Sequence, residues 1–351
     1  MIRNIFFRFT VTRSGSDFAQ LIPLPGVAPT IRMDESAAIK TSFSGTFAAP
    51  SEDIDLMTDE IRPVLILDGE EYALGVFLPA TVQPEENATT KSIRIEAYDR
   101  CWLARDYRTE DMQYFAAGTN YINAIKSLLI ETGNGTISAT PTEHTLPEAR
   151  EDWEPGTDYL SIINELLGEI NYTELWFDGR GVAMLHPFRS EINSSQIDHV
   201  LDETRVESMM LPTLRRETDL YSAPNVFTVI CSNPDKSTGM TATAENTNPQ
   251  SPLAIQKRGR RIVQVTNVDN CASQEELQLY ANRQLTDSML RGEVITVQTG
   301  LLPGFGVGEI TALRFGEIFA ICRERAWTMQ LETGGVMTHT LERQVLNLAS
   351  S

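Results

Sequence analysis

The chain has 351 residues and a formal net charge of −19 at pH 7. At ~100–200 residues per domain, this length suggests about two to four domains. The acidic balance argues against a surface that binds nucleic acid, because phosphate binding needs clustered Lys and Arg. The sequence also contains no run near the ~20 apolar residues of a membrane-spanning helix.

Residues 1–105 have the pattern of a first β domain. Apolar and polar residues alternate over residues 1–12, which is the two-residue period of a strand. We therefore expect no secretory signal at this end, since a signal needs an unbroken apolar segment. Apolar runs at 64–67 and 72–77 flank Asp68-Gly69, a pair that favours the tight turn of a β-hairpin.

Residues 106–205 change to a helical period and predict a small α/β domain. Residues 118–129 and 156–167 echo each other, with Gly, Thr, Asn or Asp, Tyr and a Leu-Leu pair at matching positions. Each segment predicts an amphipathic helix with a Thr or Asx cap. An internal duplication would explain the echo, and so would repeated use of the same capping and core chemistry. Short strands are expected on either side of Asp178-Gly179.

Residues 206–351 predict a second β domain. Strand patterns occur at 226–231, 262–265, 295–299, 310–315, 327–331 and 337–341. Gly334 and Gly335 supply the positive backbone dihedrals that a tight turn between the last two strands needs.

Two other segments interrupt this β pattern. Residues 232–252 are polar and rich in Asn, Thr and Pro, which predicts a loop that serves as an adaptable contact segment. A helix is predicted at 273–291, where Ser273 precedes Glu276 by the spacing of a capping box.

The sequence predicts no catalytic, cofactor-binding or metal site. The cysteines are scattered without a C-x-x-C pair and have the pattern of small buried hydrophobes in a reducing compartment. The histidines lack ligand spacing, and His186 and His339 are interpreted as structural. No G-x-S-x-G element favours a serine hydrolase. The four cysteines are Cys101, Cys231, Cys271 and Cys322, and the four histidines are His144, His186, His199 and His339.

Three further segments could carry chemistry, but a structural interpretation is stronger for each. Residues 304–308 (GFGVG) resemble a phosphate loop but lead into a strand pattern, which favours a turn. The basic cluster of residues 257–261 borders a predicted strand and is interpreted as a solvated or interface edge. Asp152 and Glu154 beside Trp153 could form a sugar-cleaving site, yet acidic residues before a helix are also typical of its N-terminus.

The order of several C-terminal motifs resembles the baseplate or tail-tip hub proteins of tailed bacteriophages and contractile injection particles. By motif the resemblance covers the last third of the chain, and the first two thirds match by domain layout. The motifs are NVFTVI (225–230), PQSP (249–252), GRR (259–261), SQEELQLYA (273–281), LLPG (301–304), VGEI (307–310), WTMQL (327–331) and MTHTLER (337–343).

This resemblance implies an α+β, mainly β fold with two tail-tube-like β-barrel or β-sandwich domains, a small α/β insertion domain and an inserted capped helix. It implies a homotrimeric ring that continues a hexameric tail tube and adapts it to a threefold spike. The implied partners are further copies of the chain, a tail tube or distal tail protein, a spike or fibre protein and a tape measure protein. DNA would pass through without specific binding, and the protein would be assembled in the host cytoplasm into a virion tail.

Two alternative functions belong to other classes. A tail-associated cell-wall hydrolase would need a pair of carboxylates in a cleft. A host carbohydrate-binding tail protein would need exposed aromatic platforms, whereas Trp102, Trp176 and Trp327 lie within or beside strand patterns and are interpreted as core.

Overall fold

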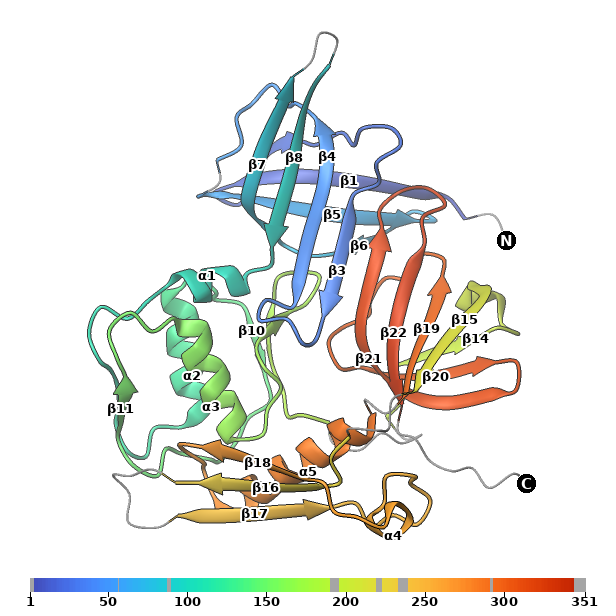
Figure 1. Ribbon diagram of the computed structural model, residues 1–351. Coiled ribbons are helices and arrows are strands. Elements are labelled where there is room, and N and C mark those ends of the chain that lie inside the picture. The colour runs from blue at the N-terminus through green and yellow to red at the C-terminus, as the bar shows by residue number, and fades with distance from the viewer. Residues whose placement is uncertain are drawn as a thin grey trace.

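The structure is a computed structural model that describes residues 3–55, 57–86, 90–189, 196–218, 223–232, 239–290 and 293–343. The fold is mainly β, with four groups of elements around the centre of the molecule (Figure 1). An N-terminal sheet lies at the top of this view, an α/β module at the left, the C-terminal strands at the right and a small sheet with one long helix at the bottom.

The N-terminal sheet has four antiparallel strands in the order β2-β1-β5-β6. They are β1 (Ile5–Arg13), β2 (Ser16–Gln20), β5 (Asp59–Leu67) and β6 (Glu70–Ala73). β5 and β6 form the predicted hairpin, and both turn residues, Asp68 (φ 52°) and Gly69 (φ 91°), have the positive φ of a type I′ turn.

A ten-stranded sheet joins the two ends of the chain. Its main path is β15-β19-β22-β21-β3-β4-β8-β7, and β20 pairs with both β14 and β21 beside this path. The N-terminal half supplies β3 (Thr30–Asp34), β4 (Thr41–Ala48), β7 (Leu78–Glu86) and β8 (Lys91–Tyr98). The C-terminal half supplies β14 (His199–Asp202), β15 (Met210–Thr218), β19 (Glu293–Thr299), β20 (Ile310–Phe315), β21 (Ile318–Gln330) and β22 (Met337–Arg343), with the short helix η1 (Val206–Ser208) before β15. β20 and β16 (Val226–Cys231) have the predicted bounds. Gly334 (φ 82°) lies in the predicted turn after β21, but Gly335 does not have the positive φ that was expected of it.

The α/β module is built from two similar halves. Asn120 caps α2 by accepting from the Asn123 amide, and Asp158 caps α3 by accepting from the Ser161 amide. The first half contains α1 (Cys101–Asp106), β9 (Gln113–Phe115), α2 (Tyr121–Glu131) and β10 (Ile137–Ala139), and the second contains β11 (Arg150–Trp153), α3 (Tyr159–Glu169), β12 (Trp176–Phe177) and β13 (Ala183–Leu185).

The two halves of the module form matching backbone hydrogen bonds. The Gly118 amide donates to the Leu146 carbonyl, and the equivalent Gly156 amide donates to the Thr109 carbonyl, each at 2.8 Å. Strand β9 of the first half also pairs antiparallel with β11 of the second half. Capping chemistry alone does not require these reciprocal contacts, and both explanations of the sequence echo stay open.

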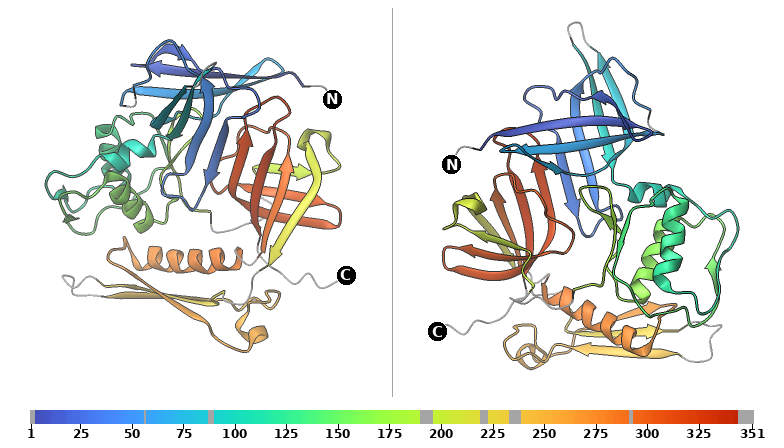
Figure 2. Two further views of the ribbon diagram at one scale, coloured as in Figure 1. Left: turned by 45° about the horizontal axis from the view of Figure 1, so that its top comes forward. Right: turned by 180° about the vertical axis from the view of Figure 1, so that it is seen from behind.

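The small sheet has the order β17-β16-β18 and is covered on one face by α5 (Figure 2). Its strands are β16 (Val226–Cys231), β17 (Met240–Glu245) and β18 (Val263–Val268), with α4 (Ile255–Arg258) between the last two and α5 (Gln274–Leu290) after them. Ser273 Oγ accepts from the Glu276 amide at 3.1 Å, which confirms the N-terminal cap, whereas the Glu276 carboxylate contacts His144 and does not complete the predicted capping box.

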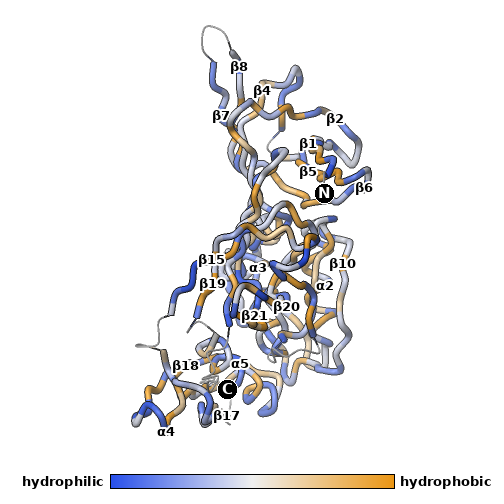
Figure 3. The backbone as a smooth tube through the Cα atoms, turned by 90° about the vertical axis from the view of Figure 1, so that its right-hand side faces the viewer, coloured by the Kyte–Doolittle hydropathy of each residue, from blue (hydrophilic) through white to orange (hydrophobic). Residues whose placement is uncertain are grey.

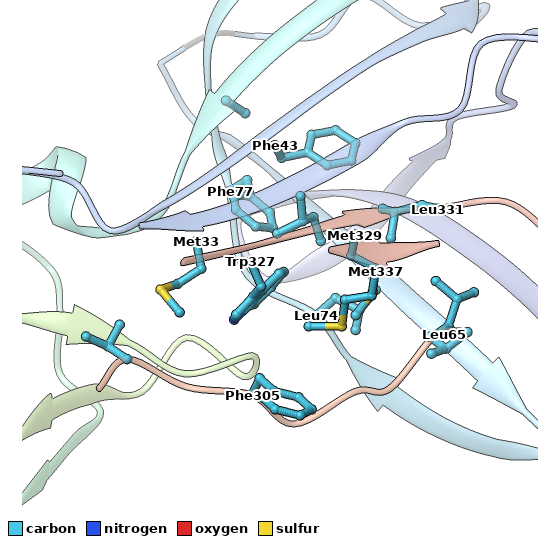
Figure 4. Close-up of a cluster of buried hydrophobic side chains, with 14 of the residues drawn as sticks. Met33, Phe43, Leu65, Leu74, Phe77, Phe305, Trp327, Met329, Leu331 and Met337 are labelled. Carbon is cyan, nitrogen blue, oxygen red and sulfur yellow. The ribbon is translucent and has the colours of Figure 1, made fainter. Parts of the chain in front are cut away.

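Among the described residues, the buried apolar side chains form three hydrophobic cores. The largest lies between the N-terminal sheet and the ten-stranded sheet, where Phe43 packs against Phe9, Phe47 and Phe77. Figure 4 shows part of this core, in which Phe43 and Phe77 lie above Trp327 and Met329 of β21. Such a core buries one face of each sheet and leaves the other face free.

Two expectations about the β regions are wrong. Of the two predicted forms, β-barrel or β-sandwich, the barrel is wrong: no sheet closes within the described residues, because the main path of the large sheet ends at the separate strands β15 and β7. The predicted loop at 232–252 contains β17, which pairs with β16 and turns Ala242 and Ala244 into the core under α5. Residues 233–238 of that loop lie outside the described residues, and the domain boundaries at 105 and 205 stay predictions.

Candidate functional site

The ten-stranded sheet has one apolar and one polar face, because side chains alternate along its strands. Met33, Trp327, His339 and Val297 form a buried row across β3, β21, β22 and β19. This row faces the main core. Because side chains alternate along each strand, the neighbouring rows on either side of it face the opposite side of the sheet.

The opposite side, which we call the polar sheet face, carries hydroxyl and amide groups. One register row crosses five strands through Ser42, Arg32, Thr328, Thr338 and Gln298. All five side chains are half-buried or exposed. The face includes Thr30, Arg32, Asp34, Ser42, Ser44, Thr296, Gln298, Thr328, Gln330, Thr338 and Thr340, and it continues onto the charged residues Arg94 and Glu96 of β8 and Arg215 and Glu217 of β15.

The polar sheet face carries little net charge although the chain is strongly acidic. Its arginines each lie beside a carboxylate: Arg32 pairs with Asp34 at 2.8 Å, Arg94 with Glu96 at 3.3 Å and Arg215 with Glu217 at 3.4 Å. Thr30 and Ser44 share a hydrogen bond at 2.9 Å, and Gln298 donates to Thr338 at 3.4 Å. A surface of paired hydroxyls and amides offers a passing polyanion no cluster of cations to hold it.

Both ends of the main sheet path carry features that disfavour pairing with another strand. β15 carries exposed Arg215, Arg216 and Glu217, and its hydrophilic stretch is clear in Figure 3. β7 ends in Pro84 and two exposed glutamates. Proline and charge blunt sheet edges, so contacts between copies are expected through side chains.

The predicted carboxylate pair belongs to an ion network and not to a cleft. Arg150 is 2% exposed and forms ion pairs with Asp152, Glu165 and Glu169 at 2.5–2.6 Å. Trp153 lies under the Arg150 guanidinium and donates its indole N–H to Glu165. Burial raises the pKa of Glu169, and Arg150 opposes this change.

Glu154, the other member of the predicted pair, contributes its backbone carbonyl to Thr109 and Thr157. The arrangement therefore anchors the start of α3 and does not form an acid with an aromatic sugar platform.

The basic cluster and the glycine loop are also structural. Arg261 pairs with Glu245 at 2.5 Å, and Arg258 donates to the Ala223 carbonyl, so these groups point to different partners. Residues 304–308 lead into β20 and not into a helix, as predicted. Neither segment has the geometry of a phosphate site.

The histidines each have hydrogen-bonding partners. His339 is fully buried between Thr299 at 3.1 Å and Glu324 at 3.2 Å, while His186 bonds Thr140 at 2.8 Å. Both side chains therefore have partners within the fold, as the structural interpretation expects. Across the described part of the chain, no three His, Cys, Asp or Glu side chains come together in a way that could hold a metal ion.

The partners of the other two histidines were not predicted. His199 contacts Glu309 at 2.6 Å, and His144 contacts Glu276 at 3.0 Å. Of the three tryptophans interpreted as core, Trp327 is 8% exposed, whereas Trp102 and Trp176 are half-buried. Within the described ranges, no helix combines the length and the apolar character needed to cross a membrane.

Comparison with known proteins finds similarity in structure. No protein-family model matches the chain, and no curated protein matches its sequence. A tail protein from Neisseria meningitidis is 14% identical with a TM-score of 0.69, covering 97% of this chain and 98% of its own. The 43 kDa tail protein of prophage MuSo2 from Shewanella oneidensis is 11% identical with a TM-score of 0.65, covering 96% and 98%.

A more distant neighbour is an Escherichia coli protein described as a component of the type VI secretion system with structural similarity to bacteriophage T4 tail proteins. It is 10% identical with a TM-score of 0.54, and the match covers 95% of this chain and 76% of that one. The resemblance that the C-terminal motifs indicated is therefore confirmed at the level of fold, and this chain has the fold of phage tail proteins over nearly its whole length.

Proposed function

We propose that the chain is a structural hub protein of a phage-type tail, located in the baseplate or tail tip of a virion. Three copies form a ring that continues the tail tube, and their polar sheet faces line part of the DNA path. The proposal is supported by the shared fold and by the row from Ser42 to Gln298, which joins both halves of the chain in one polar surface.

The wall of a DNA path must attract the DNA only weakly. Duplex DNA carries one negative charge per ≈ 1.7 Å of its axis, so a wall rich in Lys or Arg would retain it. The polar sheet face instead offers hydroxyls, amides and arginines that are paired with carboxylates, and the net charge of −19 adds repulsion at longer range. The mechanism is geometric: the ring seals the tube before host contact and leaves an open path afterwards.

In this proposal the ring binds a tail tube or distal tail protein on one side and a spike, fibre or tape measure protein on the other. Its role is assembly and not catalysis. Exposed apolar side chains such as Phe6 (63%) and Phe319 (67%) provide contact area for these partners. In this proposal, the two β domains predicted from the sequence form the ring, and the α/β module lies outside the ring.

The test is to co-express the chain with its tube and spike partners and to measure mass and symmetry. Native mass spectrometry should give a trimer, and negative-stain images should show a threefold ring with a central hole. Monomers alone in the presence of both partners would contradict the proposal. Clearing of peptidoglycan in a zymogram by the isolated chain, lost in Asp152→Asn, would favour the hydrolase instead.

A further inference from the structure

A cavity of about 450 Å³ lies where four parts of the chain meet, and one of them is the segment of residues 71–77 at and after β6. The large sheet contributes Met33, Trp327, Met329 and Met337 to its walls. The β12–β13 hairpin contributes Trp176 and Met184, and the loop before β20 contributes Phe305. This volume is within the ≈ 300–1,000 Å³ of small-molecule sites, and four methionines give the wall an adaptable apolar surface.

Trp327 lines this cavity and carries a buried hydrogen-bond donor, its indole N–H. Its side chain is 8% exposed, and its indole Nε1 has no acceptor among the described residues. Figure 4 shows the indole nitrogen on the side of the ring that faces Met33 and Phe305, away from Met329. A buried donor without an acceptor costs about 1–3 kcal/mol, so a bound acceptor would recover a specific contact here.

The remaining polar groups of the wall disfavour an anion. Among the described lining residues, the carboxylates outnumber the guanidinium of Arg180. Each carboxylate also has a partner already, so a cationic ligand would find no free counter-ion. The four are Glu71 with Arg8, Asp99 with the amides of Thr41 and Cys101, Asp178 with Arg180, and Glu309 with His199.

Two contacts hold the loop that carries Phe305 in position beside the cavity. Glu309 accepts from the Gly306 amide at 2.7 Å, and the Phe305 ring stacks on His199 with 3.8 Å between ring centroids. A Cβ on Gly306 would lie 2.9 Å from the Trp176 ring, so this position needs glycine for the close approach. The glycine-rich segment thus shapes one side of the cavity.

We propose that this cavity is a binding site for an uncharged molecule with an apolar body and one hydrogen-bond acceptor, such as a ketone or an ester. The apolar body packs against the methionines and Phe305. The acceptor atom of this molecule accepts a hydrogen bond from the indole N–H of Trp327. This hydrogen bond makes the molecule bind more tightly than a hydrocarbon of the same shape. The site lies behind the polar sheet face, so it is separate from the DNA path proposed above.

The test uses the full-length chain and three probes of matched shape: acetylnaphthalene, ethylnaphthalene and naphthoate. Isothermal titration should show the ketone binding about three- to tenfold more tightly than the hydrocarbon, the range expected for one net hydrogen bond, and the anion binding worst. In nitrogen-15 spectra, the ketone should shift the indole resonance of Trp327 and leave that of Trp102 in place.

Two variants separate the hydrogen bond from the cavity. Trp327→Phe should remove the preference for the ketone, and Trp102→Phe, which alters a ring stacked on Tyr98 outside the cavity, should retain it. Met184→Trp fills the cavity from its wall and should weaken both neutral probes. Absence of binding by the unaltered chain, equal affinity for ketone and hydrocarbon, or tightest binding of naphthoate would each overturn the proposal.

Discussion

Met33 and Trp327 face each other across the junction between β3 and β21, where the two halves of the chain become one sheet. Both side chains point into the core, with exposed fractions of 1% and 8%. Because this junction is a continuous hydrogen-bonded ladder and not a flexible linker, the two halves should unfold together.

Met329→Ala tests this coupling. Met329 is 1% exposed on β21 opposite Ile31 of β3, so its truncation should lower the free energy of unfolding by about 2–5 kcal/mol. Urea unfolding followed by tryptophan fluorescence and by far-UV circular dichroism should show one shared transition. Thr328→Ala, one position earlier on the polar sheet face, should change stability by less than about 0.5 kcal/mol. Two separate transitions in the unaltered chain would contradict the coupling.

The Arg150 network gives a second prediction. Arg150→Met leaves Glu169 as a buried carboxylate without its cation, which should cost about 3–5 kcal/mol at pH 7. The loss should be smaller at pH 4, because the raised pKa of Glu169 lets it become neutral there. Urea unfolding at both pH values measures this.

Two further variants check the Arg150 prediction. Adding Glu169→Gln to Arg150→Met should recover part of the stability. Arg180→Met, which breaks an exposed pair with Asp178, should cost less than about 1 kcal/mol. An equal loss at pH 4 and pH 7 for Arg150→Met would show that packing, and not charge, explains the effect.

Asp99 should make stability depend on pH. Burial raises its pKa from 3.8 to about 6, against the lowering effect of the amides of Cys101 and Thr41. The folded chain therefore holds this proton more tightly than the unfolded chain, and the stability that it adds is lost as the pH rises through about 6. Asp99→Asn should thus be more destabilising at pH 4 than at pH 7. Urea midpoints whose difference from the unaltered chain is the same at both pH values would exclude this linkage.

Cations on the polar sheet face should retain DNA. In the assembled ring, Thr328→Lys with Thr338→Lys should raise affinity for duplex DNA at 50 mM salt, and each new phosphate contact should steepen the log–log salt dependence by about 0.9. Fluorescence anisotropy over a salt series measures both effects. Thr241→Lys with Thr243→Lys, on exposed positions of β17, adds the same charge elsewhere. If that control binds DNA equally, net charge explains the effect and the conduit assignment fails.

The small sheet requires β17 for its core. Ala242 is 3% exposed and packs in the core that contains Leu277 and Ala281 of α5, so Ala242→Asp would bury an unpaired charge. We expect a loss of about 3 kcal/mol or more, seen as faster hydrogen exchange in β16, β17 and β18. Thr243→Asp, the next residue and exposed, should leave exchange nearly unchanged. Equal effects of the two variants would show that α5 does not depend on this strand.

Local chemistry was predictable wherever neighbouring residues determine it. The caps Asn120, Asp158 and Ser273 act within one helical turn, and Asp68-Gly69 determines its turn through its own dihedrals. β17 was missed because its apolar residues are small: Ala242 and Ala244 alternate with threonines, a weak signal between polar segments. Residues 240–245 nevertheless have the two-residue alternation of a strand.

Long-range pairing could not be derived from the sequence. The alternation of Thr328 with Trp327 and Met329 shows that β21 has two faces, but nothing in it names β3 as the neighbour. The same holds for the cavity, whose walls come from segments far apart in the chain. The sequence marked residues 304–308 as unusual, and only the fold shows that Phe305 faces Trp327.

The reciprocal contacts inside the α/β module also limit how it can be divided. Each half completes its neighbour, since β9 is paired by β11 and the start of each helix is held by a strand segment of the other half. A single half expressed alone would leave those backbone groups without partners, and two copies could satisfy them only by swapping into a symmetric dimer. The module is therefore expected to fold as one unit that cannot be divided into two stable halves.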